Sequence, residues 1–340
     1  MEAAGQTVLQ LLVGRWCSQA LYTGVKLGIF DEVRDEPTSA AFVADELRLE
    51  PSMTYRLLRA LASLGLLAEH ENHRFTLTEP GKFLRQDHPR SLRHLVLLEE
   101  GPEHYAVWKH LGDIIRDGGR DGFEREYGKR IFEHARDEAN YSAVFNAAMS
   151  GLSASEAETV LGLLDGEDLS DVQHLCDIAG GHGYLLTRLL QRYEHLRGTV
   201  FDLPAVAEDT ARHWARSNGV SARCTYIGGN MFEAVPAADG YCFKHVLHDW
   251  NDEECVQILQ NARRATRAGA RALVAEYVVP DHQTPHFSKL FDLHMACACG
   301  GRERTEAEYA ELFSRSGWRH THTRLPQGGN GVALLEARAV

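Results

Sequence analysis

A glycine-rich turn, followed at some distance by an aspartate, is the first feature of the sequence that indicates chemistry. The turn reads Asp-Ile-Ala-Gly-Gly-His-Gly over residues 177–183, and Asp202 ends the next apolar run, 19 residues after Gly183. Glycines let the backbone approach a ligand closely, and a carboxylate at this distance can accept both ribose hydroxyls of a nucleoside. The dinucleotide fingerprint is incomplete, because Leu186 occupies the place of its third glycine, and no Walker lysine follows. The pattern therefore favours a cofactor that contains adenosine without phosphates.

His248 and two glutamates form the second candidate set. His248 follows the fourth predicted strand, Glu276 closes the fifth, and Glu303 precedes the last predicted helix. Ligands of parallel sheets bind beyond the carboxyl ends of the strands, so these side chains can reach one crevice. A carboxylate on the far nitrogen of an imidazole would fix its tautomer and raise its basicity. His245 is the nearest rival, but the pattern places it within the strand. The two glutamates could instead form a strand-end salt bridge and compensate a helix dipole.

From about residue 172, short apolar runs alternate with helical patterns. This alternation, closed by two strands that only a loop joins, predicts an α/β, Rossmann-like, mainly parallel seven-stranded sheet with helices on both faces and one antiparallel edge. Asn251 with Glu254, and Thr305 with Glu308, are capping pairs for a helix that reaches Arg267 and for the last helix. The predicted strands cover residues 174–178, 198–201, 222–227, 241–246, 272–278, 318–323 and 332–337.

The sequence pattern of residues 1–100 predicts a helical N-terminal domain that contains a winged helix. Two short helices, which Thr38 and Ser52 would cap, precede a hairpin over residues 66–78. Arg56 and Arg59 lie on the second of these helices, where a DNA reader places its base contacts. Winged helices also serve as dimerisation modules, and the formal charge of −12 argues against a general affinity for nucleic acid. Apolar residues recur along the first helix at Val8, Leu12, Trp16 and Ala20.

Composition limits where the protein works. No apolar run approaches the 18 residues or so that a membrane-spanning helix requires, and the first residues are acidic, unlike a secretory signal. Seven scattered cysteines without a CxxC pair are typical of free thiols. We therefore expect a cytoplasmic protein without membrane or nucleic-acid partners. We divide the chain into residues 1–100, a helical bridge over residues 101–165, and a cofactor-binding domain over residues 166–340.

Taken together, the motifs resemble those of the class I, S-adenosylmethionine-dependent small-molecule O-methyltransferases of plant secondary metabolism and bacterial natural-product pathways, including the caffeate and hydroxyindole types. The resemblance covers essentially the whole chain. It rests on the glycine-rich turn, on Phe-Asp-Leu-Pro at 201–204, on Gly-Gly-Asn-Met-Phe at 228–232, on Phe-Lys-His-Val-Leu-His-Asp-Trp at 243–250, and on Gly-Gly-Arg-Glu-Arg-Thr at 300–305.

The resemblance implies roles for individual residues. It implies an intertwined homodimer, S-adenosyl-L-methionine as the cofactor, and a small, aromatic acceptor whose hydroxyl is methylated. It selects His248 over His245 as the general base, flanked by Glu276 and Glu303. The implied cofactor-binding residues are Ser153, Asp177, Gly180, Gly181, Asp202, Leu203, Asn230, Met231, Phe232 and Lys244, and the implied acceptor-binding residues are Phe145, Met149, Asp292 and Met295.

Two residues depart from the family pattern. Ala179 stands where many members have glycine, and Asn230 replaces the usual aspartate that holds the adenine. We expect altered, somewhat weaker cofactor binding from these departures.

Other functions stay open at this point. One alternative is an enzyme of the same fold that has abandoned methyl transfer, or that methylates carbon or nitrogen. Another is a transcriptional regulator that uses the winged helix. His320 and His322 share one strand face, but two ligands do not make a metal site, so we expect no metal requirement.

Overall fold

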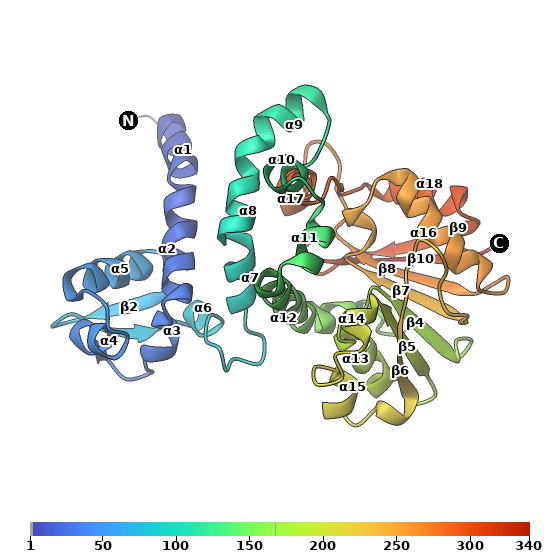
Figure 1. Cartoon of the computed structure of the whole chain (residues 1–340), viewed down its shortest axis with the longest axis horizontal. Helices are drawn as coiled ribbons and strands as arrows, with labels where there is room; N and C mark the ends of the chain where they lie inside the picture. Colours follow the sequence, from blue (N-terminus) through green and yellow to red (C-terminus); the bar gives the residue numbers. More distant parts are fainter. Residues whose placement is uncertain (1–2, 167) are drawn as a thin grey trace. The chain divides into compact units, whose positions relative to one another are not determined.

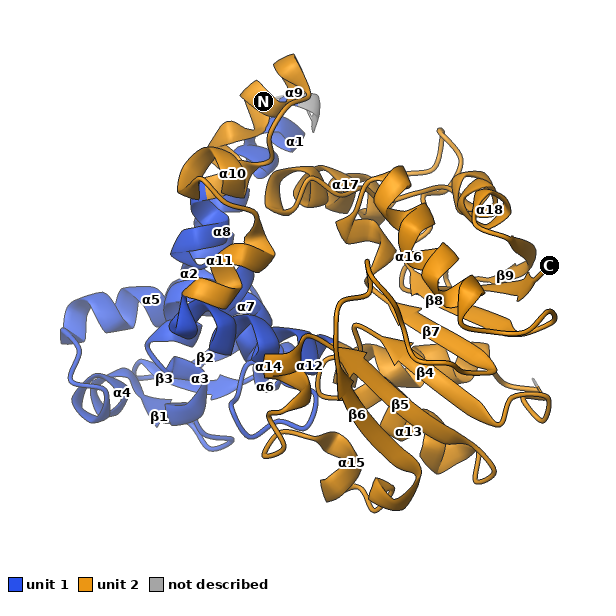
Figure 2. Cartoon of the chain, turned by 45° about the vertical axis from the view of Figure 1, so that its right-hand side comes forward, with its two compact units in different colours: residues 1–106, 138–152 blue, residues 107–137, 153–340 orange. Residues whose placement is uncertain are grey.

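The computed structural model describes residues 3–166 and 168–340. The chain folds into two compact units, which Figure 2 colours separately: unit 1 comprises residues 1–106 and 138–152, and unit 2 comprises residues 107–137 and 153–340. The long helix α12 (Ala139–Leu163) contributes residues to both. No helix among the described residues combines the length and the apolar character that a membrane span needs. The three-part division at residues 100 and 165 stays a prediction.

Unit 1 is mainly helical and carries one small sheet (Figure 1). Its helices, besides its part of α12, are α1 (Ala3–Leu12), α2 (Gly14–Lys26), α3 (Ile29–Glu32), α4 (Ala40–Glu46), α5 (Pro51–Ser63), α6 (Glu79–Lys82), α7 (Arg93–Glu99) and α8 (Pro102–Val107), whose last residue belongs to unit 2. Its strands are β1 (Thr38–Ser39), β2 (Leu67–His70) and β3 (Arg74–Leu77), in the order β1-β3-β2.

The winged helix is present, since α4 and α5 precede the antiparallel hairpin β2–β3. Both predicted caps are wrong by one or two residues. Ser39, not Thr38, caps α4, because the Ser39 hydroxyl accepts the N–H of Phe42, whereas the Thr38 hydroxyl is bonded to the backbone of the preceding turn. Glu50, not Ser52, caps α5, because Pro51 takes the first helical position, where its missing N–H costs nothing. Cap types alone do not fix a helix start when a strand or a proline lies beside them.

The N-terminal apolar stripe lies on two helices rather than one, because the helix is interrupted at Val13, between α1 and α2. Its large side chains are exposed to solvent: Val8 is 66% exposed, Leu12 64% and Trp16 62%. Contiguous apolar exposure of this kind marks an interaction surface.

Unit 2 is an α/β domain (Figure 1). Its helices, besides its part of α12, are η1 (Trp108–His110), α9 (Leu111–Asp117), α10 (Gly122–Tyr127), α11 (Ile131–Asp137), α13 (Tyr184–Arg192), α14 (Pro204–Ala207), α15 (Trp214–Ser217), η2 (Ser221–Arg223), η3 (Leu247–Asp249), α16 (Asp252–Arg264), α17 (Phe287–Ala298) and α18 (Glu306–Arg315). Its strands are β4 (His174–Ile178), β5 (Arg197–Asp202), β6 (Cys224–Gly228), β7 (Gly240–Lys244), β8 (Arg271–Glu276), β9 (Trp318–Arg324) and β10 (Ala333–Ala339).

The described residues of unit 2 form one seven-stranded sheet, in the order β6-β5-β4-β7-β8-β10-β9. The first five of these strands pair in parallel, which confirms the prediction of a mainly parallel sheet. The predicted antiparallel edge is present, since the edge strand β9 pairs antiparallel with β10. The antiparallel strand β10 lies inside the sheet, between β8 and the edge strand β9. The chain reaches β9 first, at the edge, and then turns back to fill the gap beside β8.

Both faces of the sheet are covered by helices, as predicted. On one face, α12 and α13 pack on alternate strand residues through Leu161, Leu186, Leu175, Val200 and Leu273. On the other face, α16 and α18 pack through Ile258, Phe313, Ile178, Phe243 and Val274. Burial on both sides explains the near-continuous apolar runs of the central strands, and it leaves the loops beyond the strand ends free for chemistry.

The capping pairs Asn251–Glu254 and Thr305–Glu308 form the complete reciprocal boxes that the sequence predicts. Helix α16, however, ends at Arg264 rather than at Arg267. The chain turns there toward β8 through a glycine with φ of 84° at position 269.

Candidate active site

The loop after β7 carries the two neighbouring histidines of the site. His248 lies in the short helix η3, just beyond the carboxyl end of the strand, as expected. His245 does not lie within the strand, which ends at Lys244, so that prediction is wrong. His245 adopts a left-handed backbone with φ of 53°, and histidine is among the side chains that tolerate this region. The reversal points the loop back along the sheet edge.

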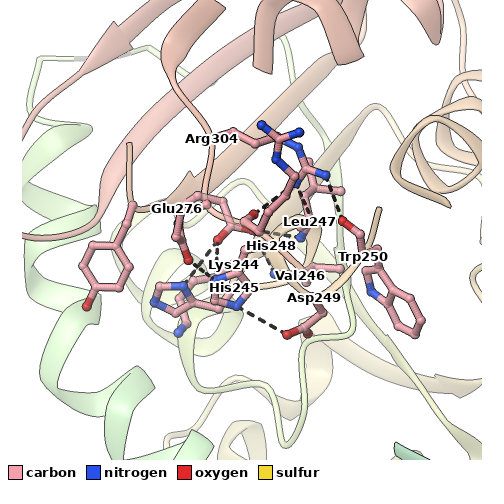
Figure 3. Close-up of polar contacts among 12 residues, drawn as sticks. Lys244, His245, Val246, Leu247, His248, Asp249, Trp250, Glu276 and Arg304 are labelled. Atoms are coloured by element: carbon pink, nitrogen blue, oxygen red, sulfur yellow. Dashed lines mark hydrogen bonds and ion pairs between the residues drawn. The ribbon is translucent and has the colours of Figure 1, made fainter. Parts of the chain in front are cut away.

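His248 is buried, and its two ring nitrogens have different partners (Figure 3). Nδ1 lies 2.7 Å from Oε1 of Glu303, which is a short hydrogen bond. Since a carboxylate only accepts, Nδ1 carries the proton of this bond. Nε2 makes no hydrogen bond within the described residues, and Oδ1 of Asp249 lies 3.6 Å from it. Nε2 is therefore the ring nitrogen that can accept a proton from a ligand.

Glu276, fully buried at the end of β8, holds the loop rather than the imidazole alone. Its Oε1 accepts the backbone N–H groups of Val246 and Leu247, each at 2.9 Å. Its Oε2 lies 3.5 Å from Nδ1 of His248 and 3.4 Å from Nδ1 of His245. One carboxylate thus fixes the backbone of the loop and faces both histidines.

Arg304 and Gly301 clamp the same loop, and neither is assigned a role of its own in the sequence analysis. The guanidinium of Arg304, 0% exposed, donates to the carbonyls of Leu247 and Trp250 and pairs with Asp252 at 2.8 Å. Gly301 passes so close to the loop that a Cβ atom there would collide with the carbonyl oxygen of His248. Both residues belong to the motif at 300–305, which is visible in the sequence. Their contacts with the loop depend on tertiary packing, which is not.

The charges around His248 determine its protonation. Burial by itself lowers its pKa, but the attraction of Glu276, Glu303 and Asp249 outweighs burial and raises the pKa to about 10. Burial raises the pKa of Glu276, yet His248 and His245 outweigh this effect and lower it to about 2. Burial raises the pKa of Asp249 to about 6. The surrounding carboxylates therefore favour the protonated form of His248 in the protein without ligand.

A second cluster adjoins the first and was missed in the sequence. Glu156, on α12, accepts from His245 Nε2 at 2.9 Å and from the Tyr277 hydroxyl at 3.0 Å, and lies 3.3 Å from Lys244 Nζ. Burial raises the pKa of this carboxyl, but the positive charges of His245 and Lys244 lower it to about 2. Ser153, a predicted cofactor contact, lies one helical turn before Glu156 on the same helix. Glu156 lies about 90 residues before Lys244 and His245 in the chain, so no local sequence pattern links it to them.

The glycine-rich turn after β4 is built over Asp177. This buried carboxyl lies under the turn: a Cβ atom at Gly180 would lie 2.6 Å from its Oδ2. Burial raises the pKa of Asp177 to about 7. Ala179 and Gly181 have φ of 52° and 58°, the left-handed region that favours glycine. Ala179 therefore strains the turn.

Asp202, at the end of β5, is arranged as a ribose acceptor requires. Its Oδ2 accepts the N–H of Gly181 at 2.8 Å, and its Oδ1 accepts the N–H of Leu203 at 2.7 Å. Each oxygen keeps a lone pair for a hydroxyl. The Leu203 side chain beside it is 52% exposed and offers an apolar contact. These features fit a nucleoside.

The segment after β6 contains the predicted adenine contacts Asn230, Met231 and Phe232. Oδ1 of Asn230 accepts the N–H of Phe232 at 3.0 Å, and its Nδ2 donates to Glu233 at 3.0 Å. The amide is thus already engaged in shaping the turn. Met231 and Phe232 are half-buried and pack on the core of the sheet.

The predicted acceptor residues fall in different parts of the chain. Phe145 and Met149 belong to unit 1, and Asp292 and Met295 lie on α17 in unit 2. Oδ1 of Asp292 accepts the N–H of Glu303 at 2.9 Å, so it supports an acid of the site. Met295 is buried. Their contact with an acceptor stays a prediction.

Ligand atoms of His245, His248 and Glu276 lie within 4.8 Å of one another, which is a spacing that could hold a metal ion. The short bond of His248 to Glu303 is that of a proton-bearing nitrogen. The absence of a metal requirement stays a prediction.

Comparison with known families gives two matches along the chain. The model of the O-methyltransferase domain matches residues 108–319, and that of the O-methyltransferase dimerisation domain matches residues 9–87.

Individual relatives agree with these matches. Phenazine O-methyltransferase PhzM of Lysobacter antibioticus is 34% identical over 334 residues, covering 98% of this chain and 96% of the relative. The crystal structure of LaPhzM superimposes with a TM-score of 0.91 at 34% identity and covers 99% of each chain. The structure of NcsB1 from neocarzinostatin biosynthesis, solved with S-adenosylmethionine and 2-hydroxy-5-methyl naphthoic acid, has a TM-score of 0.78 at 29% identity and covers 95% and 96%.

Proposed function

Because the chain belongs to the S-adenosylmethionine-dependent O-methyltransferase family, we propose that it methylates a phenolic hydroxyl of a small aromatic molecule, with His248 as the general base. The observation that carries this proposal is the buried His248, whose Nδ1 is held by Glu303 and whose Nε2 has no hydrogen bond to any residue that the structure describes. The relatives named for phenazine and crystallised with a hydroxynaphthoic acid support an aromatic acceptor.

The chain offers a place for the cofactor, which supplies an electrophilic methyl group on a sulfonium. Asp202 would take the ribose hydroxyls, and the backbone at Gly180 and Gly181 would allow close approach. Lys244 and Ser153 would lie toward the methionine end, and Leu203, Asn230, Met231 and Phe232 toward the adenine. Asp177 would act by supporting the turn from below.

The general base has a defined task. A phenol with a pKa near 10 is about one part in a thousand ionised at neutral pH, a deficit of roughly 4 kcal/mol. Once Nε2 of His248 has lost its own proton to solvent, it accepts the hydroxyl proton during attack, while Nδ1–H stays bound to Glu303. The pKa of His248, about 10, matches that of a phenol, so the proton can be shared between the two. A further positive charge bound in the crevice lowers the pKa of the imidazolium and helps to leave the base neutral.

The test of the base is His248→Ala. Turnover should fall by about 10²-fold or more, because general-base assistance is worth about 10² to 10⁴, while calorimetric affinity for S-adenosylmethionine stays nearly unchanged. Asp202→Ala is the matched opposite, and it should abolish cofactor binding. Near-normal turnover of His248→Ala would remove the base assignment.

The acceptor class has its own experiment. A thermal-shift screen with S-adenosylmethionine and a panel of phenols, hydroxyphenazines and hydroxynaphthoic acids should stabilise the protein with hydroxylated aromatics. Product mass and NMR analysis then locate the new methyl group. A methyl group on nitrogen or carbon would contradict the proposal. The cytoplasmic location stays a prediction.

A further inference from the structure

His245 and His248 compete for one carboxylate. Their rings stack with centroids 5.0 Å apart and planes inclined by 20°, and Oε2 of Glu276 faces Nδ1 of both, at 3.4 Å and 3.5 Å. Glu276 is fully buried and makes no hydrogen bond through this oxygen. The charge of one histidine therefore changes how strongly Glu276 attracts a proton on the other.

The surroundings of His245 favour its charged form. Its Nε2 lies 2.9 Å from Oε2 of Glu156, and its Nδ1 faces Glu276. Both partners are carboxylates, which only accept, so both nitrogens must carry a proton to satisfy them. Burial lowers the pKa of His245, but Glu156 outweighs burial and raises it. His245 thus places a positive charge directly on the face of the His248 ring.

We propose that His245 is a positioning residue for methyl transfer: its positive charge, held by Glu156, offsets Glu276 and limits how tightly His248 retains its proton. The proposal rests on the proposed function, because it acts through His248 as the base. His248 must lose a proton before it can accept one from a phenol, so a group that opposes its protonation raises the active fraction near neutral pH.

The other charged groups of the site do not replace this one. The acids that face the pair all favour protonation of His248, and Lys244 and Arg304 direct their charges to Glu156 and to loop carbonyls. A unit charge about 5 Å away in a protein of effective dielectric constant about 20 shifts a pKa by about two units. The charged and titratable groups packed around the two histidines are Glu276, Glu303, Asp249, Asp292, Glu156, Lys244, Tyr277 and Arg304.

The kinetic test is His245→Asn, because asparagine tolerates the left-handed backbone and carries no charge. The dependence of kcat/KM on pH is measured with S-adenosylmethionine and the acceptor found in the phenol panel, in buffer with a chelator. We expect a loss of about tenfold or more at pH 7 that shrinks as the pH approaches 10. An equal loss at every pH would mean a merely structural role and overturn the proposal.

A second readout needs no acceptor. The full chain, labelled with ¹³C-histidine, is titrated by NMR without cofactor between pH 6 and 10.5, and His248→Asn identifies the His248 signal. In His245→Asn the midpoint of His248 should rise by about one unit or more, so that the ring is still mostly protonated at pH 10.5. An unchanged or lower midpoint would overturn the proposal. His195→Asn, which removes an exposed histidine bonded to the Leu169 carbonyl, is the matched control and should leave the midpoint unchanged.

The same set of variants separates the two proposals. If His248→Asn keeps near-normal turnover and the same rise of activity with pH, the general-base proposal fails. If His248→Asn loses that rise while His245→Asn shows the same pH dependence as the unmodified protein, only the role of His245 fails.

Discussion

At the scale of single residues, the main determinant is the number of carboxylates around one imidazole. Glu276, Glu303 and Asp249 raise the pKa of His248 from its usual 6.5 to about 10, against the effect of burial. These acids favour a protonated His248, and the ring must lose this proton before it can act as a base. Enzymes of this construction should therefore work better at mildly alkaline pH than a free histidine would suggest.

This raised pKa gives a stability prediction. A histidine with a higher pKa in the folded state contributes stability that is fully present below about pH 6.5 and is lost as the pH rises through about 10. The loss is up to about 1.4 kcal/mol per pH unit in that window. Glu303→Gln removes one of the acids, so the folded pKa falls and the decline becomes smaller. Urea denaturation at pH 7 and at pH 10 checks this.

The quantity to compare is the decrease in the free energy of unfolding from pH 7 to pH 10, not its absolute value at one pH. Glu253→Gln, which removes a mostly exposed acid paired with Arg315, is the control and should decline like the unmodified protein. An equal decline for Glu303→Gln would contradict the electrostatic explanation.

At the scale of elements, two backbone positions decide how the turns hold the site. Ala179, exposed, adopts a left-handed backbone in the turn after β4. A residue with a Cβ atom destabilises the folded state by about 1–2 kcal/mol in this conformation. Glycine avoids that strain, but it loses more conformational freedom on folding, which offsets part of the gain in stability. We expect Ala179→Gly to raise the free energy of unfolding by about 0.5–1 kcal/mol in urea denaturation. Ala237→Gly, in an exposed loop outside that region, should lower it instead.

Gly301 is the second position. Its backbone passes against the carbonyl of His248, and Arg302 N–H binds that same carbonyl at 2.8 Å. We expect Gly301→Ala to displace the loop and to lower turnover by about 10²-fold, with a smaller effect on S-adenosylmethionine affinity. Gly112→Ala, which meets open space in α9, is the control and should keep normal turnover. Normal turnover of Gly301→Ala would contradict this prediction, because it would show that the loop can move without loss of activity.

The elements also show what the sequence could and could not predict. The strand at residues 174–178 is found where it was expected, because Leu175, Cys176 and Ile178 give a short apolar pattern that the sheet buries. The left-handed turn at His245 has no such signal, so the strand was extended across it. Glu156 lies far from its partners in the chain, and only folding brings it to Lys244 and His245. Motifs located the loops, while long-range contacts determined which atoms meet.

At the scale of the whole molecule, the chain carries the dimerisation domain of its family, which supports a homodimer. The exposed apolar side chains of α1 and α2 lie within or beside the matched residues. We predict that they form part of the interface between two copies.

The interface prediction is tested by Trp16→Glu. A buried unpaired charge opposes association, so light scattering should show a shift from dimer toward monomer. Leu325→Glu changes a leucine that is 61% exposed in unit 2 and should leave the mass unchanged. A dimer of undiminished stability in Trp16→Glu would place the interface elsewhere.

The bond between Glu276 and the amides of Val246 and Leu247 has a practical consequence. Two adjacent N–H groups in a loop would normally exchange with deuterated water quickly, but here both are sequestered by a fully buried carboxylate. Their exchange should be as slow as that of the neighbouring strands. These two protons can therefore report the integrity of the centre in any variant, before a reaction is ever assayed.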